Sequence, residues 1–158
     1  MIHYVIGDAT QPIGKGQKII VHICNDIGRW GKGFVVALSK RWKEPEKVYR
    51  NWYTNPENGN LMELGKIQPV RVEEDITVMN MIGQQGIYSS KGVPPIRYES
   101  VRICLKKVND FALKMKDQKV SIHMPRIGCG LAGGKWTEIE KIICDTLPRF
   151  DVYVYDLD

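Results

Sequence analysis

Two glycine-rich segments constrain the fold and the chemistry of this chain more than any other feature of its sequence. Residues 22–34 (HICNDIGRWGKGF) hold three glycines within six positions, and residues 125–136 (PRIGCGLAGGKW) hold four within seven. Each segment follows an apolar run and precedes residues with helical spacing, so each predicts a loop between a strand and a helix. Glycine lets a backbone approach a ligand closely, and the N–H groups that begin the next helix attract anions. The two loops therefore predict a site for a phosphate-bearing nucleotide.

The other segments alternate between strand patterns and helix patterns. Runs rich in β-branched residues predict strands at 4–6, 18–24, 65–72, 76–83, 120–125 and 151–157, and we expect 65–72 and 76–83 to be a pair of central strands. Apolar residues at helical spacing predict helices that begin near residues 33, 45, 101 and 137. The short helix near residue 45 is a candidate lid. This alternation predicts a mostly parallel sheet that helices cover on both faces, with ligands beyond the carboxyl ends of the strands.

Length and composition limit the class of protein. A chain of 158 residues, 43% of them hydrophobic, is expected to form one domain over residues 1–158. We expect a cytoplasmic protein outside the membrane, since no signal-peptide pattern begins the chain and no apolar stretch reaches about 18 residues. The net charge of +5 is spread along the chain. It favours anionic ligands only weakly and forms no basic block of the kind typical of nucleic-acid binding.

Several classes of site are excluded by spacing. The four cysteines (Cys24, Cys104, Cys129 and Cys144) form no C-x-x-C pair, so we expect reduced thiols and no zinc ribbon. No His, Cys and Asp cluster has the spacing of metal ligands, and no metal is expected. Neither glycine loop matches G-x-x-x-x-G-K-[ST] or G-x-G-x-x-G, which argues against kinases and dehydrogenases.

Three motifs resemble those of a known family. Macrodomain sequences are similar to this chain in three segments: Gly7-Asp8 near the start, the run from Cys24 to Gly33 (CNDIGRWGKG) and the run from Met124 to Gly130 (MPRIGCG). The resemblance covers essentially the whole chain. It implies a three-layer α/β/α sandwich with a mixed, mostly parallel central sheet.

Macrodomains bind ADP-ribose, so the resemblance also implies a ligand and the residues around it. Asp8 would accept a hydrogen bond from the adenine amino group, and the glycine loops would wrap the diphosphate and the distal ribose. The implied ligand-binding residues are Asp8, Ala9, Gly28, Trp30, Gly31, Gly33, Phe34, Ile127, Gly128, Cys129, Gly130 and Leu131. The expected partner is ADP-ribose or an ADP-ribosylated molecule, which includes nucleic acid only where it is itself ADP-ribosylated. We expect a monomer without a cofactor.

The segment MPRIGCGL is similar to that of the macrodomain group containing the terminal ADP-ribose protein glycohydrolase. In that enzyme, the mechanism depends on a lysine after a central strand and an aspartate after the GCGL element. Here Ile82-Gly83-Gln84-Gln85 stands in place of the lysine, and Ala132 stands in place of the aspartate. The chain lacks the amine nucleophile and the carboxylate base at these positions, so that mechanism is not expected.

The ADP-ribose-1''-phosphate phosphatases of the same group also lack that lysine and aspartate, and their first loop is similar to this one. The resemblance implies hydrolysis of ADP-ribose-1''-phosphate, with His22, Asn25 and Asp26 as the catalytic residues. His22 and Asp26 would move protons or orient water, and Asn25 would stabilise developing charge.

Alternatives stay open at this point. His22 is equally well explained as a structural strand histidine, and Asp26 as a turn residue. The domain is then a non-catalytic reader of ADP-ribosyl groups. A further alternative is a hydrolase that removes ADP-ribosyl groups through substrate-assisted attack of water, in which Asn25 and Asp26 matter most.

Overall fold

The computed structural model describes residues 1–115 and 118–158. Its strands are β1 (Ile2–Ile6), β2 (Gln17–Asn25), β3 (Ile67–Glu73), β4 (Ile76–Gln84), β5 (Val120–Met124) and β6 (Asp151–Asp156). Its helices are α1 (Phe34–Arg41), α2 (Glu44–Thr54), the short 3-10 helix η1 (Glu57–Gly59), α3 (Tyr98–Leu113) and α4 (Trp136–Thr146). In these residues the strands form one sheet in the order β1-β6-β5-β2-β4-β3, in which only β3 and β4 are antiparallel.

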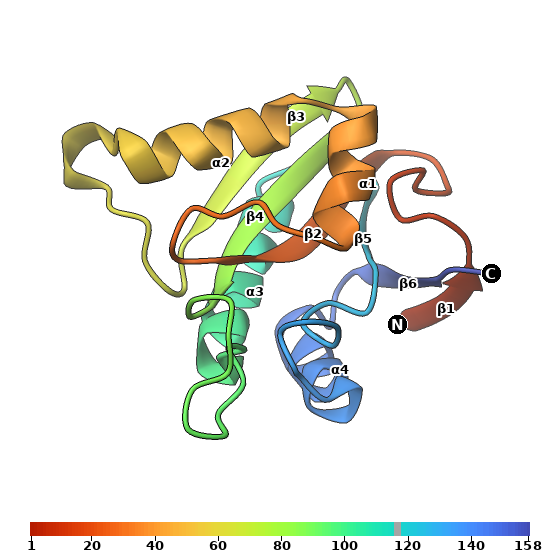
Figure 1. Cartoon of the computed structure of the whole chain (residues 1–158). Coiled ribbons are helices and arrows are strands. Elements are labelled where there is room, and N and C mark those ends of the chain that lie inside the picture. The colour runs from red at the N-terminus through yellow and green to blue at the C-terminus, as the bar shows by residue number, and fades with distance from the viewer. Residues whose placement is uncertain (116–117) are drawn as a thin grey trace.

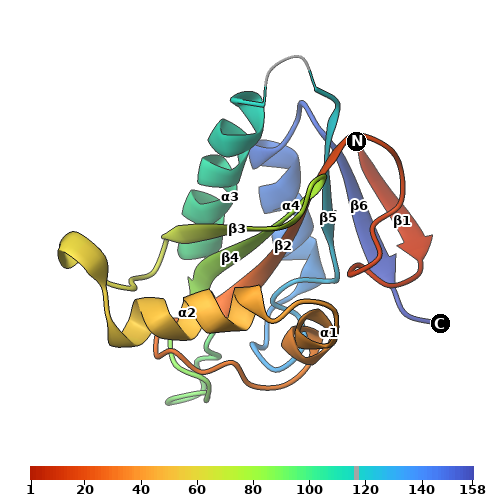
Figure 2. The ribbon, with the colours of Figure 1, turned by 90° about the horizontal axis from the view of Figure 1, so that it is seen from above.

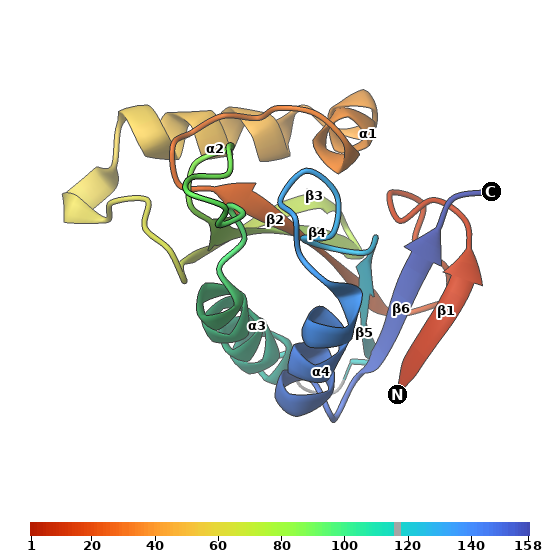
Figure 3. The same ribbon diagram turned by 60° about the horizontal axis from the view of Figure 1, so that its bottom comes forward.

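Two helical layers enclose this sheet. α1 and α2 lie on one face and α3 and α4 on the other, as Figures 1 and 3 show. The α3 and α4 side chains pack with Ile19 and Val21 of β2, whereas the α1 and α2 side chains pack with Ile20 of the same strand. Successive residues of a strand point to opposite faces, so β2 contributes to both cores. The prediction of a three-layer α/β/α sandwich with a mixed, mostly parallel sheet is confirmed.

Two expectations about single elements are wrong. β3 lies at the edge of the sheet rather than in its centre, and Pro69 within it explains why, because proline has no N–H for a second neighbouring strand. The second helix, α2, is not a lid. It packs on the sheet through Tyr49 and Trp52, which are 0% and 7% exposed, and so belongs to the core.

One half of the sheet has no helix on the α1 side. β1 and β6 lie side by side at the sheet edge where both termini are found (Figure 2), and α1 and α2 lie over β2, β4 and β3 instead (Figure 3). The loop at residues 7–16 covers part of the free half, where the N–H of Ile13 donates to the Tyr155 hydroxyl at 2.9 Å. The expectation that helices cover both faces therefore holds for only part of the sheet.

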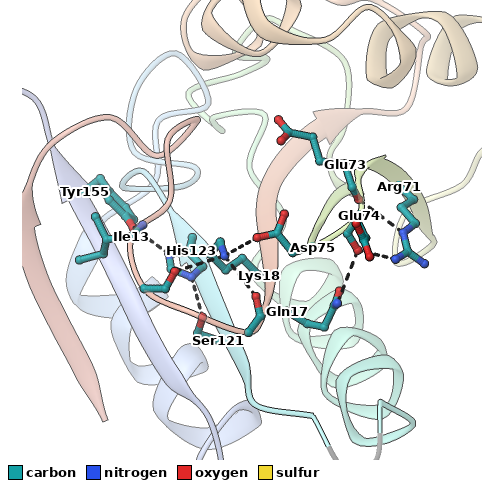
Figure 4. A network of polar contacts seen from close by, with 12 residues as sticks. Ile13, Gln17, Lys18, Arg71, Glu73, Glu74, Asp75, Ser121, His123 and Tyr155 are labelled. Carbon is teal, nitrogen blue, oxygen red and sulfur yellow. Dashed lines mark hydrogen bonds and ion pairs between the residues drawn. The ribbon is translucent and has the colours of Figure 1, made fainter.

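A buried polar network lies beneath this loop (Figure 4). The Tyr155 hydroxyl accepts from Ile13 and lies 2.7 Å from Nδ1 of His123, while Nε2 of His123 lies 2.7 Å from Oγ of Ser121. His123 is fully buried, and burial together with the nearby Lys18 charge lowers its pKa to about 4. The imidazole is thus neutral and structural at physiological pH.

Lys18 anchors the loop from below. Its Nζ donates to the carbonyls of Gly14 and Gly16 at 3.3 and 3.1 Å and to Oδ2 of Asp75 at 2.8 Å. Only 6% of Lys18 is exposed, and these three bonds satisfy the three N–H groups of the buried ammonium. Lys18 therefore contributes to the fold, at the end of the sheet opposite to the glycine loops.

Two buried histidines predict how stability depends on pH. His22 and His123 both have a pKa of about 4 in the folded chain, mainly because burial disfavours the charged form. The unfolded chain binds protons at these sites below pH 6.5, so the free energy of unfolding should fall as the pH drops from 6.5 to 4. We expect a loss of roughly 2–3 kcal/mol for each imidazole. Urea denaturation at a series of pH values measures it.

The matched variants are His123→Gln and His3→Gln. His123→Gln should lower stability at neutral pH but remove about half of the loss between pH 6.5 and 4, because one of the two buried imidazoles is gone. His3 is partly exposed and pairs with Asp151 at the surface, so His3→Gln should leave that loss intact. Equal stability at pH 7 and pH 4.5 in the unmodified chain would contradict this account.

Candidate functional site

A cleft lies at the carboxyl ends of β2, β4 and β5. The two glycine loops leave the sheet at this end, after β2 and after β5 (Figure 1). The cleft consists of two adjoining hollows of about 280 and 570 Å³, called here the inner and the outer hollow. They share Ile23, Lys32, Val35, Gln84 and Leu131. The inner hollow is also lined by His22, Gly33, Phe34, Pro125, Arg126, Ile127, Gly128, Gly130 and Ala132. The outer hollow is also lined by Cys24, Asn25, Arg29, Trp30, Gly31, Ile87, Tyr88 and Ser89.

Asn25 shapes the first glycine loop. Its Oδ1 accepts from the N–H groups of Ile27 and Arg29, both at 3.1 Å, and from the Tyr49 hydroxyl at 2.9 Å. Its Nδ2 donates to the carbonyl of Arg29 at 2.6 Å. The amide is engaged on every side within the protein, so its role in this geometry is to hold the turn after β2.

Asp26 connects the first loop to the segment after β4. Its Oδ1 accepts from the N–H of Gly86 at 2.8 Å, and its own N–H donates to the carbonyl of Gln84 at 3.0 Å. Asp26 is not among the residues that line the two hollows. It positions the Ile87–Ser89 side of the cleft rather than facing a ligand within it.

Glycines of two different kinds stand in the loops. At Gly28 a Cβ would lie 2.4 Å from the Tyr53 ring, and at Gly128 it would lie 2.5 Å from Cδ1 of Ile96, so packing and positive φ angles of 72° require both. Gly31 and Gly130 have neither constraint, since a Cβ at either position would meet nothing within 4 Å and φ is not in the left-handed region. Their lack of a side chain leaves open space in the cleft.

Unpaired backbone N–H groups lie beside the open space at Gly31 and Gly130. Within residues 1–115 and 118–158, the N–H groups that donate to no protein acceptor include those of Gly31, Lys32, Gly33, Gly128, Gly130 and Leu131. α1 begins directly after Gly33, which has no side chain to cap the helix. The first turn of α1 therefore presents free N–H donors and the positive end of its dipole at the cleft.

The charged side chains at the cleft have one sign. Arg29, Lys32 and Arg126 line the hollows, and no Asp or Glu of the described chain lines either of them. With the free N–H donors, this lining suits an anionic group such as a diphosphate. The same composition supplies no carboxylate to act as a general base. In the described residues no group of three or more His, Cys, Asp or Glu side chains is placed to hold a metal ion.

His22 lies in the wall of the inner hollow with its ring fixed from behind. Its Nε2 lies 2.5 Å from Oδ1 of Asn80, and the Asn80 amide donates from Nδ2 to Oε1 of Gln68 at 3.0 Å and to the Pro45 carbonyl at 3.2 Å. Asn80 therefore presents an acceptor to His22, and Nε2 carries the proton. Burial lowers the pKa of His22 to about 4, against the smaller opposing effect of the Asn80 bond.

Other residues around His22 pin the first loop to the core. Trp30 is 7% exposed and contacts the His22 ring edge-on, with ring centroids 5.4 Å apart, and its Nε1 donates to Oγ of Ser39 at 2.8 Å. Phe34 begins α1 and packs at 5.9 Å from the same imidazole. Of these aromatic side chains, Phe34 has its surface in the inner hollow and Trp30 borders the outer one.

The structure brings most of the sequence-predicted residues together, but not all of them. Asp8, Ala9, Gly28 and Cys129 do not line the two hollows. Asp8 accepts at Oδ1 from the N–H and hydroxyl of Thr10, both at 2.8 Å, at the end of β1. Burial raises the pKa of the Cys129 thiol, which donates to the carbonyl of Ile127. These contacts give Cys129 a packing role.

Sequence reasoning missed several lining residues. Lys32, Gln84 and Arg126 all lie within or beside the motifs but are not among the predicted ligand-binding residues. The charge of Lys32 and Arg126 in glycine loops was the available signal. Tyr88, which is 79% exposed, lines the outer hollow together with Trp30, and the sequence already indicates both as aromatic side chains that could stack on a ligand or line its rim.

Comparisons with known proteins identify close relatives over the full length. A structure of a protein of unknown function from Bacteroides thetaiotaomicron is 58% identical, with a TM-score of 0.93 and 99% and 98% of the two chains covered. A macrodomain protein from Streptomyces coelicolor is 47% identical, with a TM-score of 0.84 and 99% of each chain covered. No family model matches the sequence.

Curated relatives include proteins that match over their full length and proteins that match over a small part of it. ADP-ribose 1''-phosphate phosphatase of Candida albicans is 30% identical over 162 residues, which cover 98% of this chain and 99% of the relative. Chromodomain-helicase-DNA-binding protein 1-like of Mus musculus is 31% identical over 153 residues, but the match covers 90% of this chain and only 16% of that protein. The chain thus spans about a sixth of that larger relative. Among the described residues, no helix is long and apolar enough to cross a membrane.

The 47% identity to the Streptomyces coelicolor macrodomain protein over 99% of both chains, with a TM-score of 0.84, shows that this chain belongs to the macrodomain family.

Proposed function

We propose that this chain binds ADP-ribose in the cleft, with the diphosphate held between the two glycine loops. The observation that carries the proposal is the space at Gly31 and Gly130, where neither packing nor backbone conformation requires glycine. Free N–H groups of both loops border that space. A ligand that approaches the backbone closely and accepts hydrogen bonds accounts for both features.

Charge favours a diphosphate over a neutral ligand. Lys32 is shared by both hollows, Arg29 lines the outer one, and Arg126, which is paired with Asp156, lines the inner one. No carboxylate of the described chain lines either hollow. The two hollows together give room on either side of the shared region, which suits a ligand with a group at each end of a diphosphate. The Streptomyces relative is named as a macrodomain protein, and the Candida relative is named for an ADP-ribose phosphate.

Gly31→Glu tests the position of the diphosphate. The new side chain brings bulk and negative charge into the open space, so affinity for ADP-ribose should fall about tenfold or more, measured by isothermal titration calorimetry. The backbone at Gly31 accepts a side chain without strain, so the melting temperature should stay close to that of the unmodified chain.

Leu113→Glu is the matched control, because it adds the same charge at the C-terminal end of α3, at a residue that is 40% exposed. It should leave ADP-ribose affinity unchanged. Affinity equal to that of the unmodified chain in Gly31→Glu would overturn the placement of the diphosphate. Failure of the unmodified chain to bind ADP-ribose would overturn the proposed function itself.

A second candidate function is hydrolysis of ADP-ribose-1''-phosphate to ADP-ribose and phosphate. It is favoured by the full-length similarity to relatives named as ADP-ribose 1''-phosphate phosphatases, of which the Candida albicans protein is 30% identical. In the cleft, free N–H donors are placed to stabilise charge on a phosphoryl group. Attack by water breaks the bond between phosphorus and the ribose oxygen, releasing inorganic phosphate.

His22 is the group we propose to orient that water. Its Nε2 donates to Asn80, which leaves the unprotonated Nδ1 as its hydrogen-bond acceptor. Asn25 and Asp26, which hold the loop, act as positioning residues in this proposal. With the pKa of His22 near 4, the imidazole keeps one protonation state throughout the neutral range.

Phosphate release as a function of pH checks this role. Because His22 is already neutral, the rate from pH 8 down to about pH 5 should show no titration of His22, and the only midpoint expected is that of the substrate phosphate at about pH 6. His22→Gln should lose phosphate release while keeping ADP-ribose affinity within about threefold. Full activity in His22→Gln would remove His22 from the mechanism. If the unmodified chain binds ADP-ribose but releases no phosphate, the remaining candidate function is that of a non-catalytic reader of ADP-ribosyl groups.

A further inference from the structure

The first glycine loop is open on two sides at Gly31. This residue lines the outer hollow and also a third hollow of about 320 Å³ that α1 and α2 border, called here the rear hollow. The N–H groups of Gly31, Lys32 and Gly33 have no acceptor in the described chain. Three consecutive donors in such a segment bind a ligand tightly only if another part of the protein fixes their positions beforehand.

Trp30 directly precedes these donors and is fixed in the core. It is 7% exposed, and its ring lies against that of Tyr49 with centroids 5.5 Å apart. Apolar contacts of this kind are not directional, so on their own they leave the indole free to turn. The hydrogen bond from Nε1 of Trp30 to Oγ of Ser39 at 2.8 Å is directional. It fixes the orientation of the ring.

Ser39 belongs to a longer chain of hydrogen bonds. Its hydroxyl donates to Oε1 of Glu46 at 3.0 Å, and Oε2 of Glu46 accepts from Nε of Arg50 at 2.8 Å. An indole N–H only donates and an ionised carboxylate only accepts, so the bonds run in one direction from Trp30 through Ser39 to Glu46. A chain that ends on a charged group is stronger than an isolated neutral pair.

α2 holds the same loop at an earlier point as well. The loop runs along α2 before it enters α1 (Figure 3), and the buried Tyr49 hydroxyl donates to the carbonyl of Asn25 at 2.6 Å. The helices therefore fix the loop at its start and again just before the three donors. Neither Ser39 nor Glu46 lines the inner or the outer hollow, so any effect on a ligand there passes through Trp30.

We propose that Ser39 and Glu46 are positioning residues for ligand binding. Through Trp30 they hold the N–H groups of residues 31–33 in the arrangement that an anionic ligand requires. The inference rests on the proposed function and deepens it, because it assigns part of the affinity to side chains of α1 and α2 that do not touch the ligand.

Ser39→Ala removes the acceptor of the Trp30 indole. ADP-ribose affinity should fall about fivefold by isothermal titration calorimetry, the size expected for the loss of one neutral hydrogen bond. Ser39→Thr keeps the hydroxyl, and the rear hollow beside Ser39 gives room for the added methyl group. This variant should stay within about twofold of the unmodified chain. Ser100→Ala, at a partly buried serine of α3 on the other face of the sheet, is the matched control and should change nothing.

Nuclear relaxation of backbone amides in the ligand-free protein tests the same chain of contacts without a ligand. In Ser39→Ala, the fast motion of Gly31, Lys32 and Gly33 should increase, because the indole that precedes them is no longer fixed. Gly128 and Gly130 of the second loop should keep their mobility. Ser39→Thr should match the unmodified chain at all these amides.

The other results overturn the inference. Full ADP-ribose affinity in Ser39→Ala removes the positioning role, and a loss of affinity without a change at residues 31–33 shows that Ser39 acts by another route. An equal loss in Ser39→Ala and Ser39→Thr, or mobility raised equally in both loops, shows a general loosening of packing. If the unmodified chain does not bind ADP-ribose, the proposed function fails and the inference fails with it, whereas binding that Ser39→Ala does not affect refutes only the inference.

Discussion

The parallel pairing of β2 with β4 on one side and β5 on the other is the constraint on which the cleft depends. It brings the carboxyl ends of three strands to one edge of the sheet, so segments that are a hundred residues apart in sequence meet there. The pairing is secured by apolar side chains on both faces of β2, packed between the α1–α2 layer and the α3–α4 layer. Because both glycine loops begin at this edge, their free N–H groups face one cleft, although no backbone hydrogen bond joins the two loops in the described chain.

Polar groups buried behind the cleft give its wall a fixed shape. The chain of hydrogen bonds from His22 through Asn80 to Gln68 crosses the sheet face beneath α2, and its members are satisfied by one another and by backbone carbonyls. A buried polar group without a partner would destabilise the fold, so each bond constrains the next side chain. As a consequence, the His22 imidazole is neutral, and its Nε2 proton is used in the hydrogen bond to Asn80. His22 therefore does not titrate as an acid in the neutral range. The cleft therefore has the properties of a binding site, in which backbone N–H groups and cationic side chains are the main groups available to a ligand.

Much of the fold was predictable, because apolar periodicity identified each main helix and strand. Pro69 could have indicated that β3 is an edge strand. The glycine loops predicted where the cleft opens. What they could not predict were contacts that join distant residues: Asn80 fixes the His22 proton from 58 positions away, and Asp156 orients Arg126 from 30 positions away. Spacing within a motif contains no information on such partners.

The central claim is that backbone N–H groups of the two glycine loops hold the diphosphate, and amide NMR spectra recorded during titration with ADP-ribose test it most directly. The account predicts that the largest shifts fall on Gly31, Lys32, Gly33, Gly128, Gly130 and Leu131, because their N–H groups have no protein acceptor in the described chain. Amides of the Lys18 region, at the opposite end of the sheet, and of β3, at the edge of the sheet, should not move. Saturable binding that leaves the two loops unshifted would contradict the account.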